Sequence, residues 1–257
     1  MILIDYSQIA LSNIIVQKLN DESMIRHMIL NSIRMYNKKH RDEYGQVVIC
    51  ADGMNTWRKE FFPEYKASRK KNRDESSQDW TEIFRILHTV RDEIRDYLPY
   101  KVIHMEGVEA DDIIGTLALQ TQEFGQDEPV MIISSDKDFI QLQKYKNVKQ
   151  WSPIQKKFVT DKNPRTYLFN HIMRGDSGDG IPNVLSADDT FISENSQTPL
   201  RQTRIDSWLE HSDNLREHMD DEIYRNYQRN KKLIDLTDIP EDIQESIINN
   251  FNGQAKT

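Results

Sequence analysis

Short apolar runs alternate with longer helical patterns in the first part of the chain. Four runs are almost entirely apolar, as expected for strands that are buried on both faces. They span residues 1–4, 46–51, 101–105 and 129–134. Between them, apolar residues recur every three or four positions, which predicts helices. These patterns cover residues 25–36, 80–97 and 113–119. The alternation predicts an α/β domain with a mostly parallel central sheet flanked by helices.

The pattern changes near residue 160. Residues 147–159 alternate between apolar and polar in a way that indicates two strands joined by a loop. The chain then becomes polar and helical, interrupted by the glycine-rich stretch RGDSGDGIPNV at residues 174–184. We therefore expect two parts, an α/β core over residues 1–160 and a smaller helical region over residues 161–257.

Acidic residues follow each of the four predicted strands. They are Asp5, Asp52, Glu109, Asp111, Asp112, Asp136 and Asp138. A single aspartate in such a place usually forms a turn or caps a helix. However, the carboxyl ends of parallel strands meet at one edge of a sheet, so acids that follow all four strands are expected to converge there. Carboxylates this close together repel one another unless they are solvated or share a cation.

The residue types favour a hard divalent cation at this edge. Carboxylate oxygens are the ligands that Mg²⁺ prefers, and two ions ~4 Å apart could activate a water and stabilise the leaving oxygen of a phosphodiester. Zinc is disfavoured, because there is one cysteine and the seven histidines lack a ligand spacing. The absence of a Gly-Lys dipeptide excludes a Walker A loop. The glycine-rich stretch fits neither a dinucleotide fingerprint nor an EF-hand.

Composition narrows the setting in which this chemistry would act. With 37% hydrophobic and 30% charged residues, the chain is typical of a soluble globular protein. The first residues contain no basic leader, and no apolar run approaches the ~20 residues that cross a bilayer. Cys50 has no partner for an internal disulfide, which suits a reducing compartment. We therefore expect a cytoplasmic protein without a membrane partner.

One segment is strongly basic although the formal net charge is -8. Residues 58–73 contain seven lysines and arginines against two acids, Glu60 and Glu64. By itself, such a charge run is typical of a solvated helix face. A cluster of acids without metal repels phosphate, however, so a basic segment close to a metal-binding cluster is what cleavage of a polyanion requires.

Four motifs together resemble the structure-specific 5′ nucleases, a family that includes flap endonucleases, the 5′ nuclease domain of bacterial DNA polymerase I and phage exonucleases. RKEFFPEYKASR (58–69) resembles the basic segment of the family, and VEADD (108–112) resembles its Glu-Ala-Asp block. SSDKDF (134–139) resembles its paired aspartates, and GDSGDGIPNV (175–184) its helix-three-turn-helix hairpin. The order and spacing agree over residues 1 to about 185, and phage members look most similar.

The resemblance implies a PIN-like 5′-nuclease core with a basic arch near residues 57–78. It also implies a helix-hairpin-helix type motif at residues 164–190 that grips the backbone of a duplex. Two Mg²⁺ ions would be bound, with Mn²⁺ as a substitute. Residues implied for the first ion or its waters are Asp5, Asp52, Glu109, Asp111 and Asp136. Residues implied for the second are Asp138, Asp176 and Asp179. Two roles stay open for Asp112: it holds a metal-bound water, or it complements the dipole of the helix that follows.

The resemblance also assigns roles toward nucleic acid. Arg58 and Lys66 would contact the scissile phosphate and, with Asp111 and Asp136, form the catalytic set. Strand guidance is implied for Tyr65, Arg69 and Lys70, and close backbone approach to phosphate for Gly175, Gly178 and Gly180. The hairpin departs from the family pattern at Gly180, where asparagine is usual, and at Asn183, where glycine is usual.

The implied activity is that of a Mg²⁺-dependent 5′ to 3′ exonuclease and flap endonuclease with ribonuclease H activity. It would hydrolyse RNA:DNA hybrids and flapped, nicked or forked DNA duplexes, removing RNA primers during lagging-strand replication, as a monomer in the host-cell cytoplasm if phage-encoded. A single-strand-binding protein and a sliding clamp are candidate partners, although the sequence contains no Q-x-x-[ILM]-x-x-F-F clamp-binding box. Three alternatives stay open: a PIN-type ribonuclease on single-stranded RNA, an inactive module that binds branched DNA, and an acidic protein without metal.

Overall fold

The computed structural model of the protein describes residues 1–17, 21–193 and 195–256, and it divides the chain into two compact units. Unit 1 contains Met1–Thr56, Asp79–Lys162 and Ile239–Thr257, and unit 2 contains Trp57–Gln78 and Asn163–Asp238. One break between the units, at residues 162–163, lies close to the boundary expected near residue 160, while the basic segment groups with unit 2 and the last helix with unit 1.

Unit 1 is built on a six-stranded sheet in the order β3-β2-β1-β4-β5-β6. All pairings are parallel except that of β5 with β6, so the predicted mostly parallel sheet is confirmed. The strands are β1 (Ile2–Asp5), β2 (Val47–Ala51), β3 (Lys101–His104), β4 (Val130–Ile133), β5 (Val148–Ser152) and β6 (Lys157–Phe158). Each of the four apolar runs forms one of the first four strands, and residues 147–159 form the predicted strand pair.

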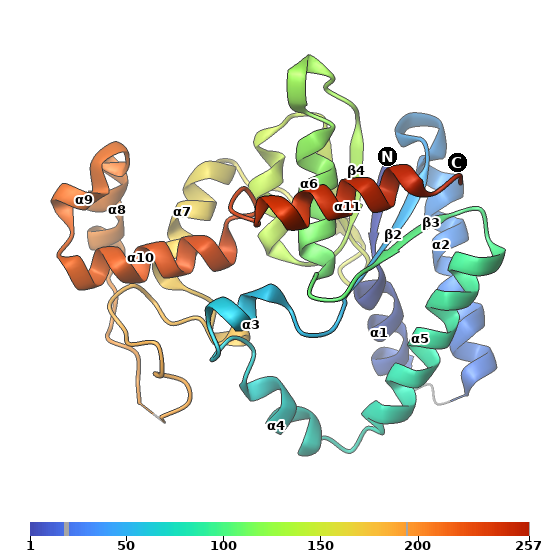
Figure 1. Ribbon diagram of the computed structural model, residues 1–257, viewed down its shortest axis with the longest axis horizontal. Coiled ribbons are helices and arrows are strands. Elements are labelled where there is room, and N and C mark those ends of the chain that lie inside the picture. Colours follow the sequence, from blue (N-terminus) through green and yellow to red (C-terminus); the bar gives the residue numbers. More distant parts are fainter. Residues whose placement is uncertain (18–20, 194, 257) are drawn as a thin grey trace. The chain divides into compact units, whose positions relative to one another are not determined.

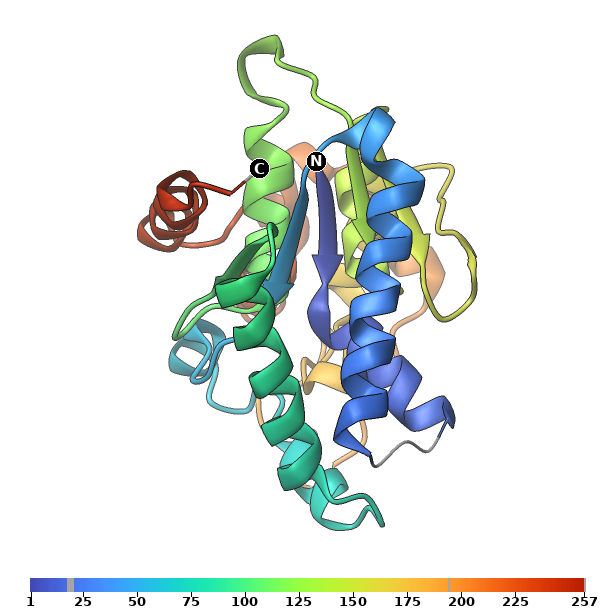
Figure 2. The same ribbon diagram turned by 90° about the vertical axis from the view of Figure 1, so that its right-hand side faces the viewer.

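Helices cover both faces of this sheet (Figures 1 and 2). They are α1 (Tyr6–Gln17), α2 (Glu22–Tyr44), α5 (Trp80–Tyr97) and α6 (Ala110–Gln120). Unit 1 also contains the 3-10 helices η1 (Glu123–Gly125) and η2 (Lys137–Lys144), and α11 (Glu241–Gly253), which packs against α6 and β3. Ile2, Ile4 and Ile49 pack with the apolar faces of α2 and α5 in one core. The residues between them in the strands, such as Leu3 and Cys50, are fully buried on the face that α6 covers. Burial on both faces explains why these strands are apolar throughout.

The edge strand β3 is covered by the last residues of the chain. The backbone N–H of Val102 donates to Oε1 of Gln254 (3.1 Å), and Nε2 of Gln254 donates to the Val102 carbonyl (2.9 Å). Nζ of Lys101 donates to the carbonyl of Phe251 at the end of α11 (3.0 Å). These contacts explain why the C-terminal helix belongs to unit 1, which no local sequence pattern indicates.

Unit 2 is helical. It contains α3 (Trp57–Phe61), α4 (Ser68–Asp74), α7 (Pro164–Arg174), η3 (Ser177–Asp179), α8 (Gln202–Glu210), η4 (Ser212–Asn214), α9 (Leu215–His218) and α10 (Asp221–Ile234). Phe62 and Tyr65 of the basic segment pack with Ile172, Leu233 and Ile234 in a small core, which is why this segment groups with unit 2. A second core around Met173 and Trp208 joins α7 to α8 and α9. Among the described helices of both units, none combines the length and the apolar character needed to cross a membrane.

Candidate active site

The acids of unit 1 lie where the strands of the sheet end. Asp5 is the last residue of β1, and its buried carboxylate accepts a hydrogen bond from Oγ of Ser134 (2.9 Å) at the end of β4. Asp52 follows β2, and its carboxylate accepts from the backbone N–H of Ala110 (2.8 Å) and from Oγ of Ser7 (3.1 Å). The parallel topology thus brings together residues from distant parts of the sequence, as predicted.

Three further carboxylates form a tight cluster. Oxygens of Asp111, Asp136 and Asp138 all lie within 4.8 Å of one another, and the three side chains are half-buried. Asp111 is in the first turn of α6, whereas Asp136 and Asp138 come from the start of η2. Asp136 has a fixed orientation, because its Oδ1 accepts the backbone N–H of Asp138 (2.9 Å). This arrangement could hold a divalent cation through oxygen ligands.

The other two acids of the VEADD motif are buried at the start of α6. Glu109 precedes the helix, and its Oε2 accepts from Oγ1 of Thr56 (3.1 Å). Asp112 is 0% exposed, and its Oδ2 accepts the backbone N–H of Glu109 (2.9 Å). This hydrogen bond is half of a capping box, so the contacts of Asp112 favour the structural side of the two roles left open by the sequence. A ligand role for Glu109 or Asp112 stays a prediction.

The electrostatics of this edge are unfavourable without a cation. Burial, and then the negative charges of Asp52 and Asp136, raise the pKa of Asp5 to about 8, although the hydrogen bond from Ser134 opposes the shift. A buried carboxyl group that stays protonated in the metal-free protein, with other acidic side chains around it, marks a place where a cation is expected. The donor set contains only hard oxygen ligands, so it fits Mg²⁺ or Mn²⁺.

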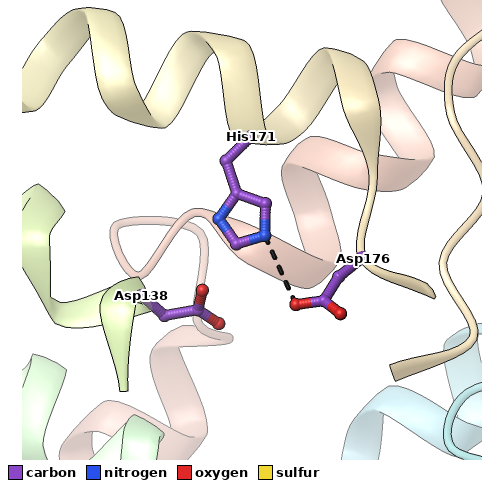
Figure 3. A group of neighbouring side chains, drawn as sticks. All are labelled: Asp138, His171 and Asp176. Carbon is purple, nitrogen blue, oxygen red and sulfur yellow. Dashed lines mark ion pairs between the residues drawn. The ribbon is translucent and has the colours of Figure 1, made fainter. Parts of the chain in front are cut away.

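The acids of the hairpin belong to unit 2. Asp176 and Ile181 form an antiparallel bridge with two backbone hydrogen bonds of 2.8 Å, which closes the glycine-rich turn. Nε2 of His171 lies 3.4 Å from Oδ2 of Asp176 (Figure 3), and this contact is the main cause that lowers the pKa of Asp176. Gly175 has a φ of 69°, and a Cβ there would lie 2.3 Å from the Ile181 carbonyl oxygen. Glycine is therefore required at this position.

The hairpin and the basic segment contact each other within unit 2. The carbonyl of Asp179 accepts the backbone N–H of Lys66 (2.8 Å), and its carboxylate binds Arg69 (2.5 Å) and lies 3.4 Å from the Tyr65 hydroxyl. A Cβ at Gly180 would lie 2.9 Å from the carbonyl oxygen of Glu64. This close approach gives a reason for glycine at a position where the family usually has asparagine. Asn183 also makes side-chain hydrogen bonds that glycine could not make.

The basic residues have different surroundings. Lys70 is exposed on α4, and Nζ of Lys66 lies 4.8 Å from the centroid of the Tyr65 ring. Tyr65 is only 2% exposed and its ring packs in the small core of unit 2, while its predicted role in guiding a strand stays a prediction. Arg58 is also buried, with Nε donating to the carbonyl of Leu233 (2.9 Å), and this contact fixes α3 against α10. The contacts with phosphate predicted for Arg58 and Lys66 stay predictions.

Two residues that contact the acids of the site were not predicted from the sequence. Ser134 donates to Asp5 and accepts the backbone N–H of Asp136 (3.1 Å), so one hydroxyl orients two predicted ligands. His171 contacts Asp176 from the last turn of α7. Ser134 could have been found from its place two residues before Asp136, in the motif of the paired aspartates. His171 gives no sequence signal, because a lone histidine in a helix is usually structural.

The comparisons with known proteins agree with this fold and identify the family. The model of the 5′-3′ exonuclease N-terminal resolvase-like domain matches residues 2–168, and that of the C-terminal domain of T4 RNase H matches residues 163–257. Ribonuclease H of Enterobacteria phage T4 is 39% identical to this chain over an alignment of 266 residues. The alignment covers 98% of this chain and 86% of that protein. Flap endonuclease Xni of Shewanella pealeana is 29% identical over 175 residues, covering 64% of this chain and 62% of that protein.

Solved structures give the same answer for the fold. The flap endonuclease of bacteriophage T5, solved as a pseudo-enzyme-product complex with DNA and metal ions, superposes with a TM-score of 0.69 at 17% identity. That match covers 98% of this chain and 97% of the other. The 5′-exonuclease of T5 with bound zinc ions superposes with a TM-score of 0.67 at 16% identity.

A parallel sheet that gathers carboxylates at one edge, in a chain that also carries a glycine-rich hairpin, defines a metal-dependent 5′ nuclease. More specifically, the chain belongs to the 5′-3′ exonuclease family and carries a C-terminal domain of the T4 RNase H type. The predicted membership of the 5′ nuclease family and the predicted similarity to its phage members are thereby confirmed.

Proposed function

We propose that the protein is a two-Mg²⁺ 5′ to 3′ exonuclease and flap endonuclease that cuts RNA:DNA hybrids and branched DNA duplexes. Its role would be the removal of RNA primers during lagging-strand replication, with Mn²⁺ able to replace Mg²⁺. The observation that carries the proposal is the cluster of Asp111, Asp136 and Asp138, whose oxygens lie within 4.8 Å at the end of the sheet. The relatives named ribonuclease H and flap endonuclease support the substrate classes.

The residues of unit 1 would divide the work of holding metal. Asp111, Asp136 and Asp138 supply oxygen ligands from two elements, and Asp5 and Asp52 supply oxygens from the ends of β1 and β2. Ser134 fixes Asp5 and the backbone of Asp136, so these ligands do not need to reorganise when metal binds. When bound, the metal ions supply a Lewis acid and lower the pKa of the attacking water.

The residues of unit 2 would handle the nucleic acid. Lys66 has a φ of 54° and its backbone is tied to Asp179, so its ammonium group projects from a fixed base. We assign to it the stabilisation of negative charge that develops on the phosphate. The hairpin at residues 175–181 would approach the phosphates of a duplex through its backbone, which gives grip without sequence preference. No side-chain nucleophile is required, because water attacks the phosphodiester.

Product analysis on 5′-labelled substrates tests this proposal. Four substrates suffice: a 5′-flapped DNA duplex, a nicked RNA:DNA hybrid, a blunt duplex and free single-stranded RNA, each with Mg²⁺ and with EDTA. We expect Mg²⁺-dependent release of short 5′-phosphorylated products from the flapped and nicked substrates. Faster cleavage of free RNA would instead support the PIN-type ribonuclease, and binding without cleavage in Mg²⁺ would support an inactive module that recognises branched DNA.

A further inference from the structure

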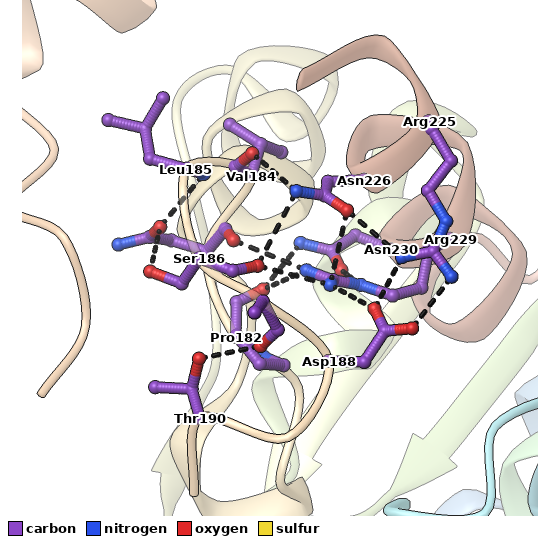
Figure 4. Close-up of polar contacts among 12 residues, drawn as sticks. Pro182, Val184, Leu185, Ser186, Asp188, Thr190, Arg225, Asn226, Arg229 and Asn230 are labelled. Atoms are coloured by element: carbon purple, nitrogen blue, oxygen red, sulfur yellow. Dashed lines mark hydrogen bonds and ion pairs between the residues drawn. The ribbon is translucent and has the colours of Figure 1, made fainter. Parts of the chain in front are cut away.

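The segment that leaves the hairpin, residues 182–188, has no regular secondary structure of its own. Its carbonyl groups therefore need hydrogen-bond donors from elsewhere, because an unsatisfied buried carbonyl is destabilising. In this protein the donors come from three side chains of α10: Asn226, Arg229 and Asn230 (Figure 4). They recur at i, i+3 and i+4, so they lie on one face of the helix. Their exposed fractions are 2%, 3% and 0%.

Arg229 makes the largest set of contacts with this segment. Nη2 donates to the carbonyls of Pro182 (3.0 Å) and Asn183 (3.2 Å), and Nη1 donates to the carbonyl of Ser186 (3.2 Å). Nη1 also binds Oδ1 of Asp188 (2.6 Å). One planar guanidinium thus fixes three carbonyls and one carboxylate, which the point charge of a lysine could not do.

The two asparagines extend this grip to both sides of the hairpin. Nδ2 of Asn230 donates to the carbonyl of Pro182 after the hairpin and to that of Ile172 before it, both at 2.8 Å. Nδ2 of Asn226 donates to the carbonyl of Val184 (3.0 Å). Asn230 therefore joins the last turn of α7 to the exit of the hairpin, so the two ends of the hairpin are held at a fixed separation.

The exit segment also orders itself around Asn183. Its Oδ1 accepts from the backbone N–H of Leu185 (3.0 Å) and from Oγ of Ser186 (2.9 Å), and its Nδ2 donates to the carbonyl of Thr198 (2.8 Å). Glycine, which the family usually has here, could make none of these side-chain contacts. Asparagine at this position thus belongs to the same polar network as the face of α10.

The charge of the buried Arg229 is balanced by Asp188. Burial lowers the pKa of Arg229, and the hydrogen bond that it donates to Asp188 opposes that shift. Arg225 binds the same carboxylate through two nitrogens at 2.5 and 2.6 Å, but more than half of its side chain is exposed. Within the part of the chain that the structure describes, Arg225 makes no hydrogen bond with the carbonyls of residues 182–186. Arg225 therefore shares the charge and the partner of Arg229 without contacting the backbone of the exit segment.

We propose that Asn226, Arg229 and Asn230 are positioning residues that hold the hairpin in the shape that receives the duplex backbone. The inference deepens the proposed function and rests on it, because it concerns how the same hairpin binds a duplex. These three side chains act through residues 172–186 and touch no reacting atom. Their loss should weaken duplex binding while the chemical step at the acidic cluster keeps its rate.

Three variants test this inference. Arg229→Met keeps length and apolar bulk but removes the donors, and Asn226→Ala is a milder change in case the first variant folds poorly. Arg225→Met is the matched control, since it removes the same charge one turn away and breaks a contact with the same Asp188. Steady-state cleavage of a 5′-flapped duplex is measured for each, at a temperature where each variant is folded by circular dichroism.

For Arg229→Met we expect a KM roughly 10-fold higher with kcat within about two-fold of the wild type, because a displaced binding element mainly weakens association. For Asn226→Ala we expect a KM about three-fold higher on the same reasoning. Arg225→Met should change neither constant by more than about two-fold. A merely structural role would reduce the amount of active enzyme, which lowers kcat and leaves KM unchanged.

Hydrogen exchange of the free protein gives a second readout that does not depend on activity. Amides of residues 175–188 should exchange faster in Arg229→Met than in Arg225→Met, with the sheet of unit 1 unaffected. An unchanged KM in both Arg229→Met and Asn226→Ala, or a lower kcat at constant KM, would overturn the inference. Failure of the wild type to bind or cut any duplex would overturn the proposed function itself, so the two failures are distinguishable.

Discussion

Two carboxylates show how differently the two units treat charge. Asp5 in unit 1 is buried among other acids, and burial followed by the charge of Asp52 raises its pKa to about 8. Asp188 in unit 2 is bound by two arginines, and the hydrogen bonds from Arg225 and then Arg229 lower its pKa. The charge of Asp188 is compensated within the chain, whereas the acids where the strands of unit 1 end are left to be compensated by something that binds. The arrangement around Asp188 stabilises the fold, whereas the arrangement around Asp5 provides a site for chemistry.

Asp111→Asn should have the largest effect and tests the acidic cluster. We expect cleavage of a flapped duplex in Mg²⁺ to fall by roughly 10²–10³-fold, because the variant removes a ligand and a charge from the site where phosphate must be stabilised. Stability without metal should not fall, since one repelling charge is lost. Glu43→Gln, on the exposed surface of α2, is the charge-matched control. Retention of more than a tenth of the activity would show that Asp111 is not essential.

Arg229→Met should lower the stability of the folded protein, unlike Asp111→Asn. We expect the free energy of unfolding to fall by about 3 kcal/mol, because Asp188 loses a partner and three buried carbonyls lose a donor. Urea denaturation measures this as a lower midpoint at an unchanged slope. A loss below about 1 kcal/mol would mean that the polar network contributes little beyond what an apolar side chain offers.

The pH dependence of the metal-free protein tests the account of Asp5. Its folded pKa is raised above the ordinary 3.8 to about 8, so the folded protein binds a proton that the unfolded chain releases. Its contribution to stability is therefore complete below about pH 4 and is lost as the pH rises toward 8, by at most about 1.4 kcal/mol per pH unit. In EDTA, the melting temperature of the wild type should fall across this range more steeply than that of Asp5→Asn. Parallel profiles for the two proteins would contradict this account.

Arg225→Met should have the smallest effect. Its ion pair with Asp188 is largely exposed, so we expect a loss of at most ~1 kcal/mol at pH 7. Because the folded pKa of Asp188 is lowered from 3.8, the contribution of its partners is present above about pH 4 and disappears as the pH falls further. The difference between wild type and variant, measured by urea denaturation at pH 7 and pH 3.5, should therefore narrow. If the difference in the free energy of unfolding between wild type and Arg225→Met were larger at pH 3.5 than at pH 7, the ion pair with Asp188 could not be its cause.

The sequence was sufficient for the parts of the fold that depend on local patterns. The four apolar runs predicted β1 to β4, because strands buried on both faces must be apolar throughout. The period of the apolar residues predicted α2, α5 and α6. The convergence of Asp111, Asp136 and Asp138 followed from topology alone, since acids placed after parallel strands end at the same edge. In each case one physical rule connects the residues to their place.

The features that the sequence did not predict depend on contacts between distant residues. Asn226, Arg229 and Asn230 lie in a helix that reads as charged and solvated, and only the burial of their side chains reveals what they bind. The ring of Tyr65 packs in a core to which Ile172, Leu233 and Ile234 also belong, and these three lie more than a hundred positions further along the chain. The basic segment belongs to unit 2 for the same reason.

The side chain of Gln254 has a consequence for the behaviour of the protein in concentrated solution. The exposed edge of a sheet can recruit a strand from another molecule, which is a common route to aggregation. At β3 the primary amide of Gln254 offers Val102 one donor and one acceptor, as the backbone of a neighbouring strand would. A single side chain thus imitates a strand, and the site where a second molecule could add by β-augmentation is occupied by the protein itself.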